Sequence, residues 1–451
     1  MGKLVEQSIK TLYQGVSRQP DPVRLPGQVE QADNVLVSVV TGGFESRPSS
    51  RHITDFNFIS ASDDPAVFAY SRDNQEQYTV IINNGTLKVF DLSGTEYTVN
   101  SPNGLSYLSG LTSQDVSFVT VADYTIIANK TKTVAMVPST YVSPNQALIT
   151  CRTTNAATSY TISIDGSVVY TKTGSTVFSA TQLQTSIMSS MTLPAGFTKT
   201  ALDQTVVITG NTSFEISHTG SDKTFGPWTM GEVVGKREYL PYAAPEGYRI
   251  RVGANVGGED FGYWADFDST EGGWTESSDP YENNQFDQST MPHWLIRQAN
   301  GTFSFTQGDY IARIAGDVET VPNPDFVGNK ISSLVFHRNR LGFVSNETVF
   351  FSQSGKYFTF WPDFSTQSLD SDGFGLTVSS DTVNNLKHAI GFRKSLFLTS
   401  DKAQFEVSGE NTLTPSNASV DLSTSYLTEE KCKPITLGNT LYFAAKSGRD
   451  A

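Results

Sequence analysis

The sequence predicts a mainly β protein with β-propeller-like blades, an N-terminal arm and inserted α+β and β domains. Most segments are short runs rich in Val, Ile, Thr, Tyr and Phe, separated by clusters of Asn, Gly, Asp and Ser, which is typical of strands and turns. A strand–turn–strand pattern also recurs about every 45–55 residues, a spacing that suits the four-stranded blades of a propeller. An ordinary β-sandwich with similar hairpins is the alternative.

The repeated pattern begins at five apolar positions: Tyr78, Tyr124, Leu341, Leu396 and Leu441. At each of them we expect an apolar strand of about five residues, a polar turn and a second strand. One hairpin cannot bury its apolar face alone, whereas blades in a ring can. Because the last repeat runs into the end of the sequence, we expect the set of blades to be completed by more chain or by another chain.

Residues 141–240 are predicted to form a small α+β unit. A strand pair surrounds Asp165-Gly166, a dipeptide that favours a two-residue hairpin turn. Residues 179–191 carry apolar side chains at helical spacing, with Ser179 as the expected N-cap. Two further strands are expected in this unit, at 205–209 and 213–217.

The expected domain organisation has five parts: an arm or docking segment at 1–50, first blades at 51–140, the α+β insert at 141–240, an acidic β-rich insert at 241–324, and further, incomplete blades at 325–451. Within the acidic insert, alternation predicts strands at 248–252 and 261–267.

Composition excludes several classes of protein. The formal net charge is −14, charged residues make up 17% and aromatic residues 11%, so a long disordered chain is excluded. Two distant cysteines provide neither a disulfide framework nor a zinc site. The sequence has no run of about 18 apolar residues, so it predicts no membrane-spanning segment. The first residues do not match the pattern of a secretory signal peptide.

An acidic segment stands out at 252–296, where there are nine Asp or Glu residues and no Lys or Arg. Its acidic surface candidates are Asp266, Asp268, Glu271 and Glu276. Asp266 and Asp268 share one face of a predicted strand, and paired carboxylates beside tryptophans could hydrolyse and bind sugars. Like charges on one face are more often a solvated surface.

No motif for catalysis is present. We find no nucleophile elbow, dinucleotide-binding loop, Walker loop or zinc-protease motif, and the five histidines lack ligand spacing. The stretch Asp370-Ser371-Asp372-Gly373 is similar to the start of a calcium loop but lacks the closing Glu, which favours a plain turn. The sequence therefore predicts a protein that is not an enzyme, with no catalytic residue, cofactor or metal.

Six stretches carry a resemblance to a known family: QGVSRQPDPVRLPGQ (Gln14–Gln28), TGGFESRP (Thr41–Pro48), TVADYTIIANK (Thr120–Lys130), MPHWLIRQANGTFSF (Met291–Phe305), FVGNKISSLVFHRNRLGFVSN (Phe326–Asn346) and LTSDKAQFEVSG (Leu398–Gly409). They resemble the tail tubular protein B family, the nozzle proteins of short-tailed, autographivirus-type bacteriophages. The resemblance runs from about residue 8 to the end and is weakest in 141–240. Family members are longer, so the chain resembles their N-terminal portion.

This resemblance implies a structural protein of the virion tail. Family members form a hexameric ring beneath the ring of the tail adaptor protein, continue the DNA channel, dock tail fibres and close the exit until genome ejection. The family fold includes a β-propeller with inserted domains. From the negative net charge we also expect double-stranded DNA to pass without tight binding, because an acidic wall repels phosphate.

The arm supplies the candidates for partner docking. Prolines hold a backbone extended at low entropic cost, and arginines can make bidentate contacts with carboxylates. The candidates are Gln19, Pro20, Arg24, Pro26, Gln28, Arg47 and Pro48. Two other functions remain open from the residues alone: an extracellular β-propeller that binds or cleaves surface polysaccharide, and a β-rich binding module of unknown partner.

Overall fold

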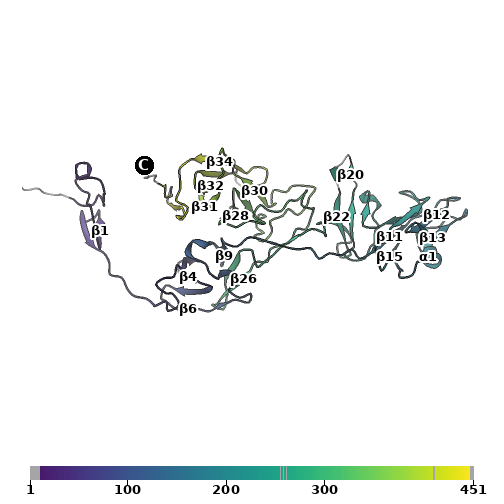
Figure 1. Cartoon of the computed structure of the whole chain (residues 1–451), viewed down its shortest axis with the longest axis horizontal. Helices are drawn as coiled ribbons and strands as arrows, with labels where there is room; N and C mark the ends of the chain where they lie inside the picture. The colour runs from purple at the N-terminus through teal and green to yellow at the C-terminus, as the bar shows by residue number, and fades with distance from the viewer. Residues whose placement is uncertain (1–10, 254, 257–258, 261, 410–411, 447–451) are drawn as a thin grey trace, which may run out of the picture. The chain divides into compact units, whose positions relative to one another are not determined.

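The computed structural model describes residues 11–253, 255–256, 259–260, 262–409 and 412–446. The chain divides into two compact units, Met1–Asn57 and Phe58–Ala451, each described here by itself. Among its described residues, 11–57, the first unit, purple in Figure 1, contains one short 3-10 helix and one antiparallel hairpin: η1 (Asp21–Val23), β1 (Val35–Ser38) and β2 (Gly43–Ser46). The division falls seven residues beyond the expected end of the arm, and the other expected boundaries stay predictions.

Three sheets of the second unit are antiparallel four-stranded meanders, in which each strand pairs with the next in sequence. The first has β3 (Ala66–Ser71), β4 (Gln77–Asn83), β5 (Thr86–Asp91) and β6 (Glu96–Tyr97). The second has β27 (Ser333–His337), β28 (Arg340–Ser345), β29 (Thr348–Phe351) and β30 (Phe374–Thr377). The third has β31 (Leu386–Phe392), β32 (Ser395–Ser400), β33 (Gln404–Ser408) and β34 (Ser419–Thr424). The hairpins predicted at Tyr78, Leu341 and Leu396 are confirmed.

A five-stranded sheet joins segments that are distant in sequence. Its order is β7 (Val99–Asn100), β26 (Phe303–Gln307), β25 (His293–Arg297), β9 (Tyr124–Asn129) and β8 (Val116–Val121). Trp294 of β25 pairs with Ile126 of β9. The chain therefore leaves this sheet after β9 and returns to it with β25. The strands β25 and β26 lie inside the expected acidic insert, 241–324, but complete a sheet of the expected first blades, 51–140.

One of the predicted hairpins is wrong. The strand that begins at Tyr124 pairs with the preceding strand β8, and the segment after its turn forms β10 (Met136–Val137), which pairs with β24 (Gln285–Phe286). A neighbour outside the repeated pattern offers the hydrogen-bonding edge there. At Leu441 the strand β36 (Thr440–Tyr442) pairs with the preceding β35 (Ile435–Leu437), and the end of the predicted hairpin, 447–451, lies outside the described residues.

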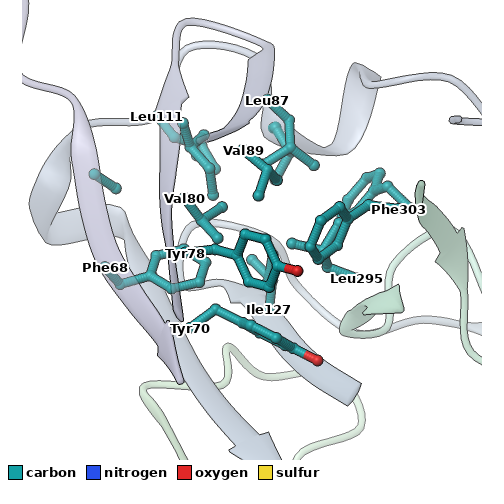
Figure 2. Close-up of a cluster of buried hydrophobic side chains, with 14 of the residues drawn as sticks. Phe68, Tyr70, Tyr78, Val80, Leu87, Val89, Leu111, Ile127, Leu295 and Phe303 are labelled. Carbon is teal, nitrogen blue, oxygen red and sulfur yellow. The ribbon is translucent and has the colours of Figure 1, made fainter. Parts of the chain in front are cut away.

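The core that joins the first meander to the five-stranded sheet is drawn in Figure 2. Phe68, Tyr70, Tyr78 and Val80 of β3 and β4 face Ile127, Leu295 and Phe303 of β9, β25 and β26. Tyr70 and Phe303 meet edge to face, with ring centroids 5.8 Å apart. These alternating residues are buried because a period of two places them on one face of each strand.

The predicted α+β region contains one helix and two sheets. The helix α1 (Ala180–Ser190) begins with a capping box: Oγ of Ser179 accepts from the backbone N–H of Gln182, whose Oε1 accepts from the N–H of Ser179. The predicted helix and its cap are confirmed. One sheet has β14 (Thr198–Leu202), β15 (Thr205–Thr209), β11 (Gln146–Cys151) and β17 (Pro227–Met230); the other has β13 (Ser167–Lys172), β12 (Tyr160–Ile164) and β16 (Ile216–Thr219).

The turn predicted at Asp165-Gly166 is confirmed, because both residues have positive φ, 49° and 76°, and join β12 to β13. The strand predicted at 205–209 is also confirmed. The strand predicted at 213–217 instead begins at Ile216 and ends at Thr219.

Two strands of the acidic segment, β22 (Tyr263–Asp268) and β23 (Gly273–Ser277), form a sheet with β18 (Val233–Val234) and β19 (Arg249–Val252), in the order β18, β19, β22, β23. We call this sheet the acidic sheet. The segment also contains a short pair, β20 (Asn255–Val256) and β21 (Glu259–Asp260). Strands are thus confirmed close to the two predicted positions, although Phe261, the first residue of the second prediction, lies outside the described residues. Short 3-10 helices also occur: η2 (Ser106–Leu108), η3 (Ser113–Asp115) and η4 (Arg237–Tyr239). Within the described ranges, no helix has the length and apolarity to cross a membrane.

Candidate docking and channel surfaces

The predicted docking stretch folds back on itself instead of remaining extended. Val16 and Val29 form a parallel bridge, in which Ser17 donates its N–H to Val29 (2.8 Å) and Val29 donates to Gly15 (2.9 Å). Gly15 has a φ of +86°, a conformation that glycine adopts without strain. Backbone pairing at the two ends therefore closes residues 15–29 into a loop.

Two of the docking candidates hold this loop together. The Arg24 guanidinium lies 2.9 Å from Oδ1 of Asp21 and 3.5 Å from Oε2 of Glu30, and it also donates to the carbonyl of Gln19 (2.9 Å). Oε1 of Gln28 accepts from the N–H of Leu25. Arg24, whose side chain is only 16% exposed, thus pairs with two carboxylates of its own segment.

The remaining docking candidates are exposed: Gln19, Pro20, Pro26, Arg47 and Pro48. Sequence reasoning missed the apolar residues that lie in the same unit. Val39 and Val40, at the turn of the β1–β2 hairpin, are 74% and 97% exposed. The run VLVSVVTGG was a signal for them, because apolar residues lead directly into turn-forming glycines. Among residues 11–57, no apolar side chain is buried.

The acidic candidate Asp266 lies on β22 and is paired. Its Oδ2 is 3.1 Å from Nε of Arg249 on the neighbouring strand β19, and its Oδ1 accepts from Oγ of Ser277 at 2.7 Å. Burial raises the pKa of Asp266, and the hydrogen bond from Ser277 and the charge of Arg249 oppose that rise. The acidic run has no cation of its own, but a cation just before it neutralises this carboxylate.

The other three acidic candidates have separate surroundings. Asp268 ends β22, and its Oδ1 accepts from the N–H groups of Thr270 and Glu271, which lowers the pKa of Asp268. Glu276 of β23 accepts hydrogen bonds from the backbone and hydroxyl of Ser365. Only Glu271 among the four is exposed.

The three tryptophans of the acidic segment take part in packing. Trp264 is 6% exposed and Trp294 is 3% exposed. Trp274 is half-buried against Phe267, and its Nε1 donates to the carbonyl of Pro241 at 2.7 Å. These indoles therefore do not form the exposed stacking surface for sugars that the sequence left open.

The carbonyls of the Asp370–Gly373 stretch bind an arginine. The Arg340 guanidinium, on β28, donates to the carbonyls of Asp370 and Asp372, both at 2.6 Å, and to Ser352 at 2.8 Å. Arg340 is 1% exposed. A calcium loop would bind its ion through the side-chain carboxylates of its first and third positions, whereas Oδ2 of Asp372 accepts from the N–H of Leu369 at 2.7 Å. In the part of the chain that the structure describes, no group of three or more His, Cys, Asp or Glu residues could hold a metal ion.

Comparison with known proteins identifies the family. A family model for the bacteriophage nozzle protein matches residues 2–450. The chain belongs to the bacteriophage nozzle protein family. It is also similar to tail tubular protein gp12 of Escherichia phage T7, with 31% identity over 466 residues. That alignment covers 98% of this chain and 58% of the T7 protein, so the chain spans somewhat more than half the length of this relative.

Membership of the nozzle family makes the chain a structural protein of the virion tail. The resemblance carried by the six stretches between Gln14 and Gly409 is confirmed, and so is the mainly β fold. Of the sequence-predicted candidates, those that are exposed lie in the Met1–Asn57 unit, together with Glu271 just after β22.

Proposed function

We propose that the chain forms part of a phage tail nozzle, in which a ring of copies encloses the DNA exit channel and offers a docking platform during genome ejection. The observation that carries this proposal is the match of the nozzle family across residues 2–450. A hexameric ring, contact with the tail adaptor protein and contact with tail fibres belong to the same proposal.

The sheets support a propeller-like arrangement of blades in this nozzle. The meanders β3–β6, β27–β30 and β31–β34 each have four antiparallel strands, as propeller blades do. Adjacent sheets also share apolar cores, since Val344 and Phe351 of the second meander pack with Leu398 and Phe405 of the third. We infer that further blades complete the ring.

The Met1–Asn57 unit is the proposed docking element for the adaptor protein. A unit that buries no apolar side chain among its described residues has little internal hydrophobic stabilisation. Val39 and Val40 would gain that stabilisation against a partner, and Arg47 and Gln19 would supply polar contacts at the rim. Arg24 and Gln28 would act indirectly, by shaping the loop.

The acidic sheet is proposed to face passing DNA. With a net charge of −14, the chain lacks the excess of Lys and Arg that drives tight phosphate binding by counterion release. Exposed carboxylates such as Glu271 would repel the duplex and let it slide.

We also propose that the chain has no hydrolase activity. The polysaccharide-binding or polysaccharide-cleaving alternative depended on exposed tryptophans beside paired carboxylates. Trp264 and Trp294 are buried, and Asp266 is held by Arg249. No observation on the described residues now favours that alternative.

Imaging of the protein isolated from phage tails tests this function. We expect a ring with a central channel, and duplex DNA that stays unbound at physiological salt. A compact assembly without a channel, or micromolar retention of duplex DNA by the unmodified protein, would contradict the proposal.

A further inference from the structure

Five lysines from distant parts of the sequence surround adjoining cavities in the second unit. A cavity of about 360 Å³ is lined by Lys130, Lys330, Lys387 and Lys431, together with the buried His388. A smaller cavity of about 170 Å³ shares Lys130, Lys431 and His388 and adds Lys433. We call these five lysines and His388 the lysine pocket. It is notable in a chain with 46 acidic and 32 basic residues, because five of the 17 lysines meet here.

The charge of the lysine pocket is only partly compensated. Lys387 pairs with Glu430, with Nζ and Oε2 3.0 Å apart. Within the described ranges, Nζ of the other four lysines forms no ion pair or hydrogen bond: Lys130, Lys330, Lys431 and Lys433. Nζ of Lys433 lies over the ring of Phe118, 5.5 Å from its centroid. The pocket therefore holds an excess of ammonium groups over nearby carboxylates.

These cations act on one another. Burial lowers the pKa of Lys130, and the charges of Lys387 and Lys433 lower it further against the opposing effect of Asp115. His388 donates from Nε2 to the carbonyl of Glu430 at 2.8 Å. Burial and the neighbouring lysines also lower the pKa of His388. An anion in the cavity would relieve this repulsion.

The walls of the cavity supply small neutral groups beside the ammonium groups. Asn346 and Asn385 line the larger cavity, and side-chain amide groups are hydrogen-bond donors. The Ser332 hydroxyl also lines it but donates to the carbonyls of Leu386 and Val344, at 2.8 and 3.1 Å. Ammonium groups combined with amide donors suit a compact oxyanion with several acceptor oxygens.

We propose that the lysine pocket binds a phosphate-type oxyanion. A free phosphate ion and a phosphate of the DNA backbone share this chemistry. We favour the free ion for two reasons. The recess admits one small group, and the net charge of −14 would repel a continuous duplex. This proposal is independent of the tail role.

The test measures binding of inorganic phosphate by isothermal titration calorimetry in a buffer without phosphate or sulfate. We compare the unmodified chain with Lys130→Gln and with the double variant Lys130→Gln/Lys433→Gln. Lys223→Gln is the matched control, since Lys223 is exposed and lies outside the pocket. We expect binding to weaken about tenfold in the double variant, because each charge-assisted hydrogen bond to an anion contributes substantially, and to be unchanged in the control.

Two further measurements make the result decisive. The variant Lys130→Arg keeps the charge and should retain phosphate binding, which separates loss of the site from loss of fold. A short duplex is titrated at equal phosphate concentration; duplex that displaces inorganic phosphate from the unmodified chain but not from the double variant would assign the pocket to the DNA backbone. Phosphate binding that is absent from the unmodified chain, or equal in all variants, would overturn the proposal.

Discussion

Oδ2 of Asp266 lies 3.1 Å from Nε of Arg249, and this ion pair links strands β22 and β19 across the acidic sheet. The pair is about one quarter to one third exposed, and Ser277 donates to the second carboxylate oxygen. A residue expected to offer free negative charge is therefore part of the local fold. Changing it alters two properties at once, charge and strand pairing.

We predict that Asp266→Asn lowers the free energy of unfolding by about 1 to 2 kcal/mol, because a charge-assisted hydrogen bond between partly buried groups is lost. Glu271→Gln removes the same charge at an exposed site and should leave stability unchanged. Chemical denaturation of both variants measures the difference. A double-mutant cycle with Arg249→Gln should then show coupling; equal effects of Asp266→Asn in the presence and absence of Arg249 would refute the pairing.

The variant Glu271→Lys tests whether this residue faces the proposed channel. We predict that it slows genome ejection and that added salt relieves the slowing. A lysine there would attract passing phosphate, and salt screens that attraction. Asp266→Lys and Asp268→Lys are poorer probes, since Asp268 accepts two backbone N–H groups. Ejection rates measured at two ionic strengths decide the outcome, and an unchanged rate would place Glu271 away from the DNA.

We predict that deletion of residues 1–57 leaves the unfolding of the rest nearly unchanged and blocks incorporation into tails. The chain divides at Asn57, and the first unit buries no apolar side chain among its described residues. Thermal unfolding followed by circular dichroism tests the first part. In the full chain, the double variant Val39→Ser/Val40→Ser should also weaken incorporation. A truncated chain that fails to fold would contradict the prediction and show that the arm belongs to a core.

We predict that Arg340→Met destabilises the chain by about 3 to 5 kcal/mol. The buried guanidinium donates to the carbonyls of Ser352, Asp370 and Asp372, and its removal leaves them without a donor. Arg340→Lys should recover only part of the loss, since one ammonium group cannot reach as many carbonyls. The exposed Lys394→Met is the control. Urea unfolding measures all three; a loss below about 1 kcal/mol would contradict this role.

We predict that stability falls as the pH is lowered from about 6.5 to 4, in part through His293. Burial lowers the pKa of His293 to about 4, while an unfolded histidine titrates near 6.5. Between these values the unfolded chain binds the extra proton, so acid favours unfolding. The contribution is on the order of 3 kcal/mol at pH 4.

The variant His293→Phe isolates this effect. His293 stacks on Tyr107 with ring centroids 3.9 Å apart, and a phenyl ring preserves that packing but loses the hydrogen bond from Nδ1 to the carbonyl of Met291. The difference in stability between the two proteins should shrink as the pH falls. A constant difference between pH 7 and pH 4 would exclude titration of His293.

Local features of this protein could be predicted from sequence because they depend on neighbouring residues. The capping box of Ser179 and Gln182, the positive-φ turn at Asp165-Gly166 and the hairpins at Tyr78, Leu341 and Leu396 each involve groups a few residues apart. The stretches that resemble the nozzle family were equally visible, since they are runs of consecutive residues.

Only the tertiary structure decided which distant groups meet. Apolar burial brings Ile126 of β9 beside Trp294 of β25. No local pattern predicts that β9 pairs with β25 and not with the segment that follows its own turn. The same long-range packing sets Arg249 against Asp266, and Lys130 beside Lys387 and Lys431. Ion pairs and hydrogen bonds form only between groups a few ångströms apart. The partner of each charged or polar side chain is therefore determined by where the strands pack and not by spacing along the chain.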